Sequence, residues 1–91
     1  MADLLSDDEI ARDVPNGWER EGDEIVRVYE FDDYLDGVAF ATSVGEVAEE
    51  EFHHPEIVIG YGTVEGRFTT HDAGGITGKD IHMAELCNDY R

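Results

Sequence analysis

Lysine, cysteine and proline are scarce in this 91-residue sequence, in which Lys79 is the single lysine, Cys87 the single cysteine, and only two residues are proline. One cysteine excludes an internal disulfide framework, and no paired-cysteine spacing typical of a zinc site is present. No segment reaches the roughly 20 apolar residues that a membrane helix needs, and the N-terminus lacks the basic start and apolar stretch of a secretory signal. We therefore expect a cytoplasmic protein in which Cys87 is a small buried apolar side chain.

Positive charge is also scarce, because 6 Lys and Arg stand against 23 Asp and Glu, which gives a net charge of −17. We therefore expect no nucleic-acid partner and no membrane partner. Such an excess would repel itself in dilute salt, but the Debye length falls to roughly 3 Å at about 1 M salt, where this cost largely vanishes. The composition favours a salt-loving source, and an acidic protein from an ordinary organism is the alternative.

The length and the hydrophobic content indicate a folded protein rather than a disordered one. A hydrophobic share of 41% is ordinary for globular proteins. A chain of 91 residues supports one modest core. We expect one domain over residues 1–91.

The first third of the chain predicts a short helix followed by a hairpin. Ser6 and Glu9 form a Ser-x-x-Glu capping box, and the helix should stop near Val14, before Pro15. Two strands joined by a tight turn are then expected within residues 18–31.

The middle of the chain predicts one long amphipathic helix and a second hairpin. Apolar residues recur with a helical period from Tyr34 to Phe52, and polar residues occupy the opposite face. Pro55 ends this helix, and the segments 57–61 and 64–70 are rich in residues that favour strands.

The last segment predicts a C-terminal helix and completes the fold class. Thr77 is the expected N-cap, Asp80 occupies the third helical position, and the helix runs toward Cys87. The order is then helix, two strands, helix, two strands, helix. This order predicts an α+β domain of two layers, with a four-stranded antiparallel sheet and helices packed on one face.

Three of the four histidines lie where this fold would bring them together. His53 and His54 close the long helix, and His71 ends the last strand. Glu49 lies one helical turn before His53, so we expect it to influence the orientation or the charge of that histidine. Imidazole has an unperturbed pKa of roughly 6.5, so its acid and base forms coexist near neutrality. Repulsion makes it hard to protonate a whole cluster at once, so one ring can donate a proton while another accepts one.

Two other interpretations of the histidines remain open at this point. His53 and His54 could simply cap the C-terminus of the long helix, where cationic side chains are favoured. Three imidazoles could also bind zinc and leave a fourth position open. Adjacent histidines seldom aim at one ion, so we expect no metal.

The spacing of these residues resembles the pterin-4a-carbinolamine dehydratase family, known in animals also as a dimerisation cofactor of a homeodomain transcription factor. The family pattern of an acidic residue, His-His-Pro, an aromatic, a histidine and a later aspartate is matched by Glu49, His53, His54, Pro55, Tyr61, His71 and Asp80. The likeness runs from about Trp18 to Leu86 and includes Gly17-Trp18, Phe31-x-x-Tyr34, Thr70 and Gly75-Ile76-Thr77. Many members have a tryptophan where this chain has Ile57, a departure that concerns local packing.

The resemblance implies a fold, an activity and a set of site residues. The implied activity is dehydration of a hydroxylated tetrahydropterin, with no metal and no organic cofactor. The implied catalytic residues are His53, His54 and His71, supported by Glu49 and Asp80, and the implied substrate contacts are His54, Thr70 and Trp18. Asp80 has a helix cap as its alternative role, and Trp18 a place in the core.

The resemblance also implies partners. We expect a pterin as the small-molecule substrate, a homodimer or homotetramer, and an aromatic amino acid hydroxylase pathway as a candidate source of the substrate. The main rival function is a non-catalytic, dimeric protein-interaction module of the same fold, which would not need the three histidines.

Overall fold

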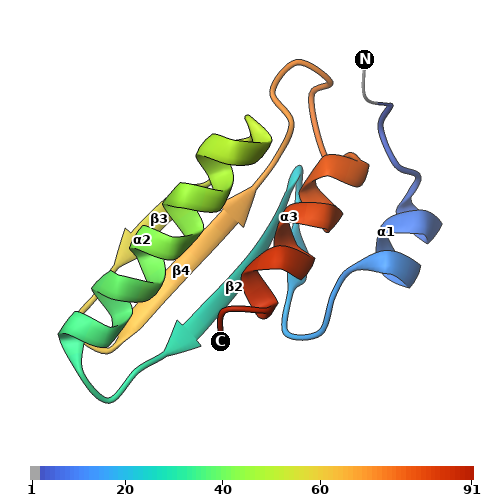
Figure 1. Cartoon of the computed structure of the whole chain (residues 1–91). Coiled ribbons are helices and arrows are strands. Elements are labelled where there is room, and N and C mark those ends of the chain that lie inside the picture. The colour runs from blue at the N-terminus through green and yellow to red at the C-terminus, as the bar shows by residue number, and fades with distance from the viewer. Residues whose placement is uncertain (1–2) are drawn as a thin grey trace.

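The computed structural model describes residues 3–91 and shows three helices and one sheet of four antiparallel strands (Figure 1). In chain order the elements are α1 (Asp7–Asp13), β1 (Glu19–Glu21), β2 (Glu24–Glu30), α2 (Tyr34–Glu51), β3 (Glu56–Ile59), β4 (Thr63–Phe68) and α3 (Gly78–Asn88). The strands are arranged in the order β1-β2-β4-β3. Helices α2 and α3 lie side by side on one face of the sheet, which confirms the predicted two-layer α+β fold (Figure 1).

The two terminal helices begin with the predicted capping boxes. In α1, Ser6 Oγ accepts from the backbone N–H of Glu9 at 3.1 Å, and the Glu9 carboxylate accepts from the backbone N–H of Ser6 at 2.9 Å. The same arrangement links Thr77 and Asp80 at the start of α3. Each box satisfies backbone N–H groups that have no partner within the helix, so the sequence pattern fixes where each helix begins.

Both hairpins form, with some change at their ends. β1 pairs with β2 and β3 pairs with β4, and the central pairing of β2 with β4 joins the two hairpins into one sheet. The last strand ends at Phe68 rather than at the predicted Thr70. It ends early because the backbone N–H of Thr70 bonds to the carbonyl of Gly75 at 2.8 Å, which closes a tight turn.

Helix α2 buries a stripe that is narrower than its sequence period suggested. Phe40, Val44 and Val47 are buried against the sheet. At the two ends of the predicted stripe, Tyr34 and Phe52 are exposed. Phe52 leaves the stripe because it is the C-cap of the helix and has left-handed backbone angles (φ 53°, ψ 39°).

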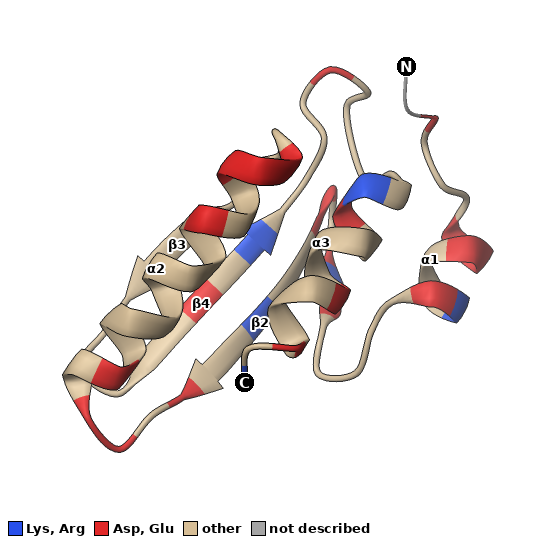
Figure 2. Cartoon of the chain, in the orientation of Figure 1, with Lys and Arg blue, Asp and Glu red and all other residues tan. Residues whose placement is uncertain are grey.

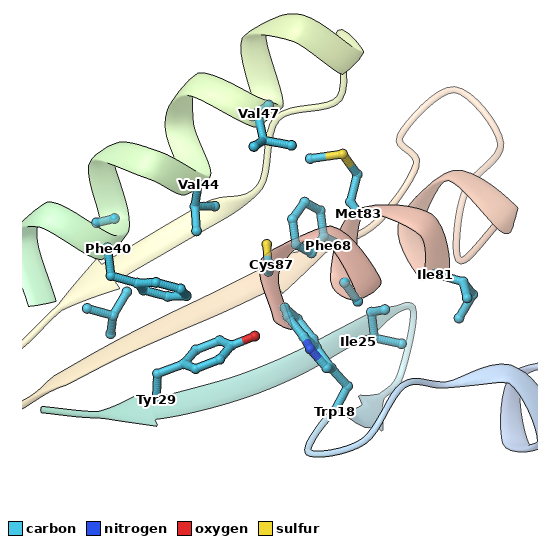
Figure 3. Packing of buried hydrophobic residues seen from close by; sticks show 14 of the residues in the cluster. Trp18, Ile25, Tyr29, Phe40, Val44, Val47, Phe68, Ile81, Met83 and Cys87 are labelled. Carbon is cyan, nitrogen blue, oxygen red and sulfur yellow. The ribbon is translucent and has the colours of Figure 1, made fainter. Parts of the chain in front are cut away.

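The core lies between the two helices and the sheet, as Figure 3 shows. Its largest contributors are Trp18, Ile25, Tyr29, Phe40, Phe68 and Met83. Cys87 is buried, as predicted, and burial raises the pKa of its thiol to about 12. Burial likewise raises the pKa of Tyr29 to about 12.

Acidic residues are spread over the outer surface of α1, α2 and the connecting turns, with few basic residues among them (Figure 2). Arg67 in β4 is the centre of one ion-pair cluster, with Glu65 at 2.8 Å, Glu24 at 3.1 Å and Glu21 at 3.2 Å. This cluster ties β1, β2 and β4 together on the face of the sheet that the helices leave open. Across residues 3–91, no helix combines the length and the apolar character needed to cross a bilayer.

Candidate active site

One cavity of about 240 Å³ lies where the end of α2 meets the connection between β4 and α3. These segments meet at the same end of the molecule in Figure 1. The cavity is lined by Phe52, His53, His54, Thr69, Thr70, His71, Asp72 and Lys79. The fold thus brings all three predicted histidines and Thr70 to one cavity, although His71 is 17 residues beyond His54 in the chain.

His53 is held by a fully buried carboxylate. Its Nε2 lies 2.5 Å from Oδ1 of Asp80, which is 0% exposed, while 12% of the His53 side chain remains exposed. The imidazole also stacks on the ring of Phe68, with centroids 6.2 Å apart and planes 13° from parallel. Asp80 therefore both caps α3 and orients a histidine of the cavity, so the two roles predicted for it coincide.

His54 and Glu49 form a second imidazole–carboxylate pair, which lies on the surface. His54 Nε2 bonds to Oε2 of Glu49, and the two side chains are 60% and 76% exposed. The sequence predicted that Glu49 would act on His53, one helical turn away. The structure pairs it with His54 instead, because the left-handed cap at Phe52 turns the chain after the last helical residue.

His71 lies in the turn that follows β4 and not at the end of the strand itself. The carbonyl of Thr70 accepts from the backbone N–H groups of Ala73 and Gly74, at 3.1 and 3.0 Å. Gly74 has φ +80°, a conformation that favours glycine, and the bond from its N–H to the carbonyl of His71 measures 3.1 Å. The tight turn fixes the backbone that carries His71 at the cavity.

Sequence reasoning did not select four of the residues that line the cavity. They are Phe52, Thr69, Asp72 and Lys79. Phe52 was assigned to the apolar face of α2, yet it is 87% exposed beside His53. The position of Phe52 in the sequence could have indicated this exposure. It comes immediately before His-His-Pro, where the helix ends, and a residue beyond the end of a helix no longer belongs to the apolar face of that helix.

Trp18 lies in the core and does not line this cavity. It is 4% exposed, its Nε1–H donates to Oδ1 of Asn88 at 3.0 Å, and its ring packs against Phe68 at 5.6 Å between centroids. Because Phe68 stacks on His53, Trp18 is one ring removed from the cavity.

A larger hollow of about 450 Å³ lies between the start of α2 and the C-terminus. It is lined mostly by acidic and apolar side chains, among them Asp32, Asp33 and Asp36, and contains no histidine. Within residues 3–91, no group of three or more His, Cys, Asp or Glu side chains has the arrangement that would hold a metal ion. The histidine cavity is lined by three of the four histidines of the chain.

Comparison with known protein families assigns almost the whole chain to one family. Residues 3–90 match the family model described as pterin 4 alpha carbinolamine dehydratase. The chain belongs to this family.

Other members of the pterin 4 alpha carbinolamine dehydratase family are similar over nearly their full length. A protein of Natronomonas pharaonis named "Putative pterin-4-alpha-carbinolamine dehydratase" is 61% identical over 85 residues, covering 93% of this chain and 92% of that protein. A protein of the same name from Halobacterium salinarum is 54% identical over 91 residues and covers 100% of both chains. The crystal structure of a transcriptional coactivator/pterin dehydratase from Brucella melitensis is 28% identical, with a TM-score of 0.88, over 94% of this chain and 96% of that one.

These comparisons confirm the resemblance that the histidine spacing suggested. They also show that the arrangement of helices and strands described above is that of a solved pterin dehydratase structure.

Proposed function

We propose that this protein is a 4a-hydroxytetrahydropterin dehydratase, which eliminates water from a pterin 4a-carbinolamine to give the quinonoid dihydropterin by histidine acid/base catalysis. The observation that carries this proposal is the position of three imidazoles on one cavity, one of them bonded to a buried carboxylate. The family of the chain supplies the substrate class.

The reaction requires two proton transfers and no change of oxidation state. One proton is delivered to the hydroxyl on the ring carbon, which leaves as water, and one is removed from the adjacent ring nitrogen as the carbon–nitrogen double bond forms. An imidazolium at the hydroxyl and a neutral imidazole at the nitrogen can each contribute about 10²- to 10⁴-fold in rate. Imidazole suits both tasks because its two forms coexist near neutrality.

In this proposal His53 and His71 act as the acid and base, and His54 chiefly holds the pterin. Asp80 orients His53 through the 2.5 Å contact, and Glu49 orients His54. Phe52 presents an exposed aromatic ring at the edge of the cavity, where it offers a surface for the flat pterin.

The protein is also proposed to work as a homodimer or homotetramer, with an aromatic amino acid hydroxylase pathway supplying its substrate. The support for an oligomer is that the sheet ends in an open edge strand, β3, in which Val58 and Ile59 are 49% and 43% exposed. Apolar edges of this kind are commonly shielded by another subunit. Sedimentation at high salt would give the number of subunits.

The test of the dehydratase proposal is stopped-flow dehydration of freshly generated carbinolamine at high salt. We expect the wild type to accelerate the reaction, and the double substitution His53→Ala with His71→Ala to abolish the acceleration. Circular dichroism and oligomer size should change little, because neither histidine belongs to the hydrophobic core. Loss of the His53 partner of the buried Asp80 carboxylate should lower Tm without changing the fold.

His82→Ala is the matched control for this experiment. His82 lies on the exposed surface of α3, where it bonds to Glu51 at 3.0 Å, and it does not line the histidine cavity. Its removal should leave the rate unchanged. Full activity in the double variant would remove His53 and His71 from the mechanism.

A second candidate function is the non-catalytic interaction module. The Brucella melitensis protein of the same fold is named a transcriptional coactivator as well as a pterin dehydratase, and the first of these two names favours the module. Recovery of a stoichiometric protein partner together with an absence of pterin turnover would support the module over the enzyme.

A further inference from the structure

Behind the histidine cavity, two threonine hydroxyls and one carboxylate form a continuous line of hydrogen bonds. The backbone N–H of Lys79 donates to Oγ1 of Thr77 at 3.2 Å, and Oγ1 of Thr77 lies 2.8 Å from Oγ1 of Thr70. Thr70 Oγ1 donates to Oδ2 of Asp80 at 2.8 Å, and Oδ1 of Asp80 lies 2.5 Å from Nε2 of His53. Thr70, Thr77 and Asp80 are all buried.

The direction of every bond in this line follows from counting donors. A threonine hydroxyl has one proton, and that of Thr70 is used on Asp80, so the hydroxyl of Thr77 must donate to Thr70. Oδ2 of Asp80 also accepts from the backbone N–H of Thr77 at 2.9 Å, which leaves that oxygen no place for a proton of its own. Among residues 3–91, no buried side-chain nitrogen or oxygen lacks a partner, so the line is complete.

The remaining proton lies between Asp80 and His53. A carboxylate oxygen can only accept, so the proton of this contact is carried by Nε2 of His53. Nδ1 is then the ring nitrogen that is free to exchange a proton with a ligand in the cavity. In the neutral ring Nδ1 carries a lone pair, which makes it a base.

We propose that Thr70 and Thr77 are positioning residues, which act through Asp80 to hold His53 in its Nε2–H tautomer with Nδ1 as the reacting atom. This proposal deepens the proposed dehydratase function and rests on it for the substrate. It changes the role of Thr70, which the sequence assigned to substrate contact, because its single hydroxyl proton is already used inside the protein. His71 then supplies the proton that leaves with water.

The decisive measurement is the tautomer of His53, read from its ¹⁵N imidazole chemical shifts in the whole protein at high salt. We expect the Nε2–H form in the wild type. Thr70→Val removes one donor from Asp80 with almost no change of shape, so the carboxylate takes up a proton from solvent more readily. The protonated Asp80 then donates to Nε2 of His53, and the neutral ring carries its own proton on Nδ1, so the Nδ1–H form appears. Thr70→Ser restores the hydroxyl and should restore the wild-type spectrum.

Kinetics of the same variants provide a second readout. Loss of a hydrogen bond to a charged group should lower kcat by about tenfold in Thr70→Val, with KM within about twofold of the wild type. In Asp80→Asn the amide oxygen must still accept from Thr70 and Thr77, so the amide NH₂ group should face Nε2 of His53. Nε2 then accepts a hydrogen bond, which favours the Nδ1–H form of the ring. Adding Thr70→Val to Asp80→Asn should then lower kcat no further, as expected for residues that act in one line.

Thr42→Val is the matched control, because Thr42 lies on the exposed side of α2 and bonds to the carbonyl of Val38 at 3.0 Å. It should leave both the tautomer and kcat unchanged. A raised KM with an unaltered His53 tautomer in Thr70→Val would show that Thr70 contacts the ligand directly, and would overturn the proposal. If the wild type fails to dehydrate carbinolamine while the tautomers change as expected, the proposed function fails and the positioning role stands.

Discussion

At the scale of single residues, Asn88 satisfies three side-chain donors with one oxygen atom. Its Oδ1 accepts from Trp18 Nε1 at 3.0 Å, from Arg27 at 2.8 Å and from the hydroxyl of Tyr29 at 2.6 Å. Its amide group donates to the backbone carbonyl of Asn16 at 3.0 Å. Asn88, which is partly buried, thereby joins α3 to β2 and to the turn before β1.

Asn88→Ala should destabilise the fold strongly for this reason. The substitution leaves the buried N–H of Trp18 and O–H of Tyr29 without their acceptor, and each such loss costs about 1–3 kcal/mol. We expect the free energy of unfolding to fall by about 3 kcal/mol, measured by urea unfolding at high salt with the fluorescence of Trp18, the single tryptophan.

Asn16→Ala is the matched control, because only the backbone carbonyl of Asn16 takes part in the cluster. Equal unfolding midpoints for the two variants would show that the Asn88 side chain contributes little.

The candidate site shows what single residues reveal in a sequence and what they do not. The sequence identified His53, His54 and His71, because histidine in the family spacing is a rare pattern. It paired Glu49 with His53 from helical periodicity alone, and periodicity fails beyond a cap with left-handed angles. The partner of His53 is Asp80, 27 residues away, and no local rule predicts that distance.

At the scale of secondary-structure elements, the approach of Trp18 to β4 depends on a missing side chain. A Cβ added at Gly66 would lie 3.3 Å from Cη2 of Trp18, which is tighter than ordinary contact. In α2, by contrast, a Cβ at Gly45 would meet nothing within 4 Å. Gly66 therefore leaves room for a neighbouring ring, whereas no neighbouring side chain requires a glycine at position 45.

Alanine at these two glycines should have opposite effects. Gly66→Ala requires the buried indole of Trp18 to shift by a few tenths of an ångström, and such overpacking costs about 1–3 kcal/mol. Gly45→Ala should stabilise the protein by up to about 1 kcal/mol, because glycine inside a helix is less favourable than alanine by that amount. Thermal unfolding of both variants checks the pair, and a Gly66→Ala protein as stable as the wild type would contradict the packing described here.

The elements also show where sequence patterns are reliable. Capping boxes predicted the start of α1 and of α3, since such a box is formed by residues three positions apart. The end of β4 was predicted two residues too late, because the bond between Thr70 and Gly75 depends on a turn that the strand pattern does not contain.

At the scale of the whole molecule, we expect net charge to govern the dependence of stability on salt. A charge of −17 on a chain of 91 residues produces self-repulsion that few ion pairs offset. Exposed ion pairs, such as Arg12 with Asp13 and Arg20 with Asp7, contribute little to the free energy of unfolding, as is usual at surfaces. The relatives from Natronomonas and Halobacterium, which are salt-loving archaea, fit the salt-loving source that the composition favours.

Stability should therefore rise with salt. Between about 0.1 M and about 2 M KCl the Debye length falls well below the spacing of surface charges, so we expect Tm to increase markedly. Replacing three acidic residues on the outer face of α2 (Asp36→Asn, Glu46→Gln and Glu50→Gln) should raise Tm at low salt and reduce its dependence on KCl. A wild-type Tm that is the same at both salt concentrations would refute charge repulsion as the cause.

The sequence by itself determined the order of helices and strands, the capped helix starts, the acidic surface and the histidines of the candidate site. These features depend on residues close together in the chain or on composition, so local physical chemistry is sufficient to read them. Only the tertiary structure decided that Asp80 faces His53, that Glu49 faces His54, that Trp18 lies behind Phe68 and that Phe52 stands at the cavity. Those outcomes depend on how α2, β4 and α3 pack across the sheet, and contacts between distant segments leave no periodic signal in the chain.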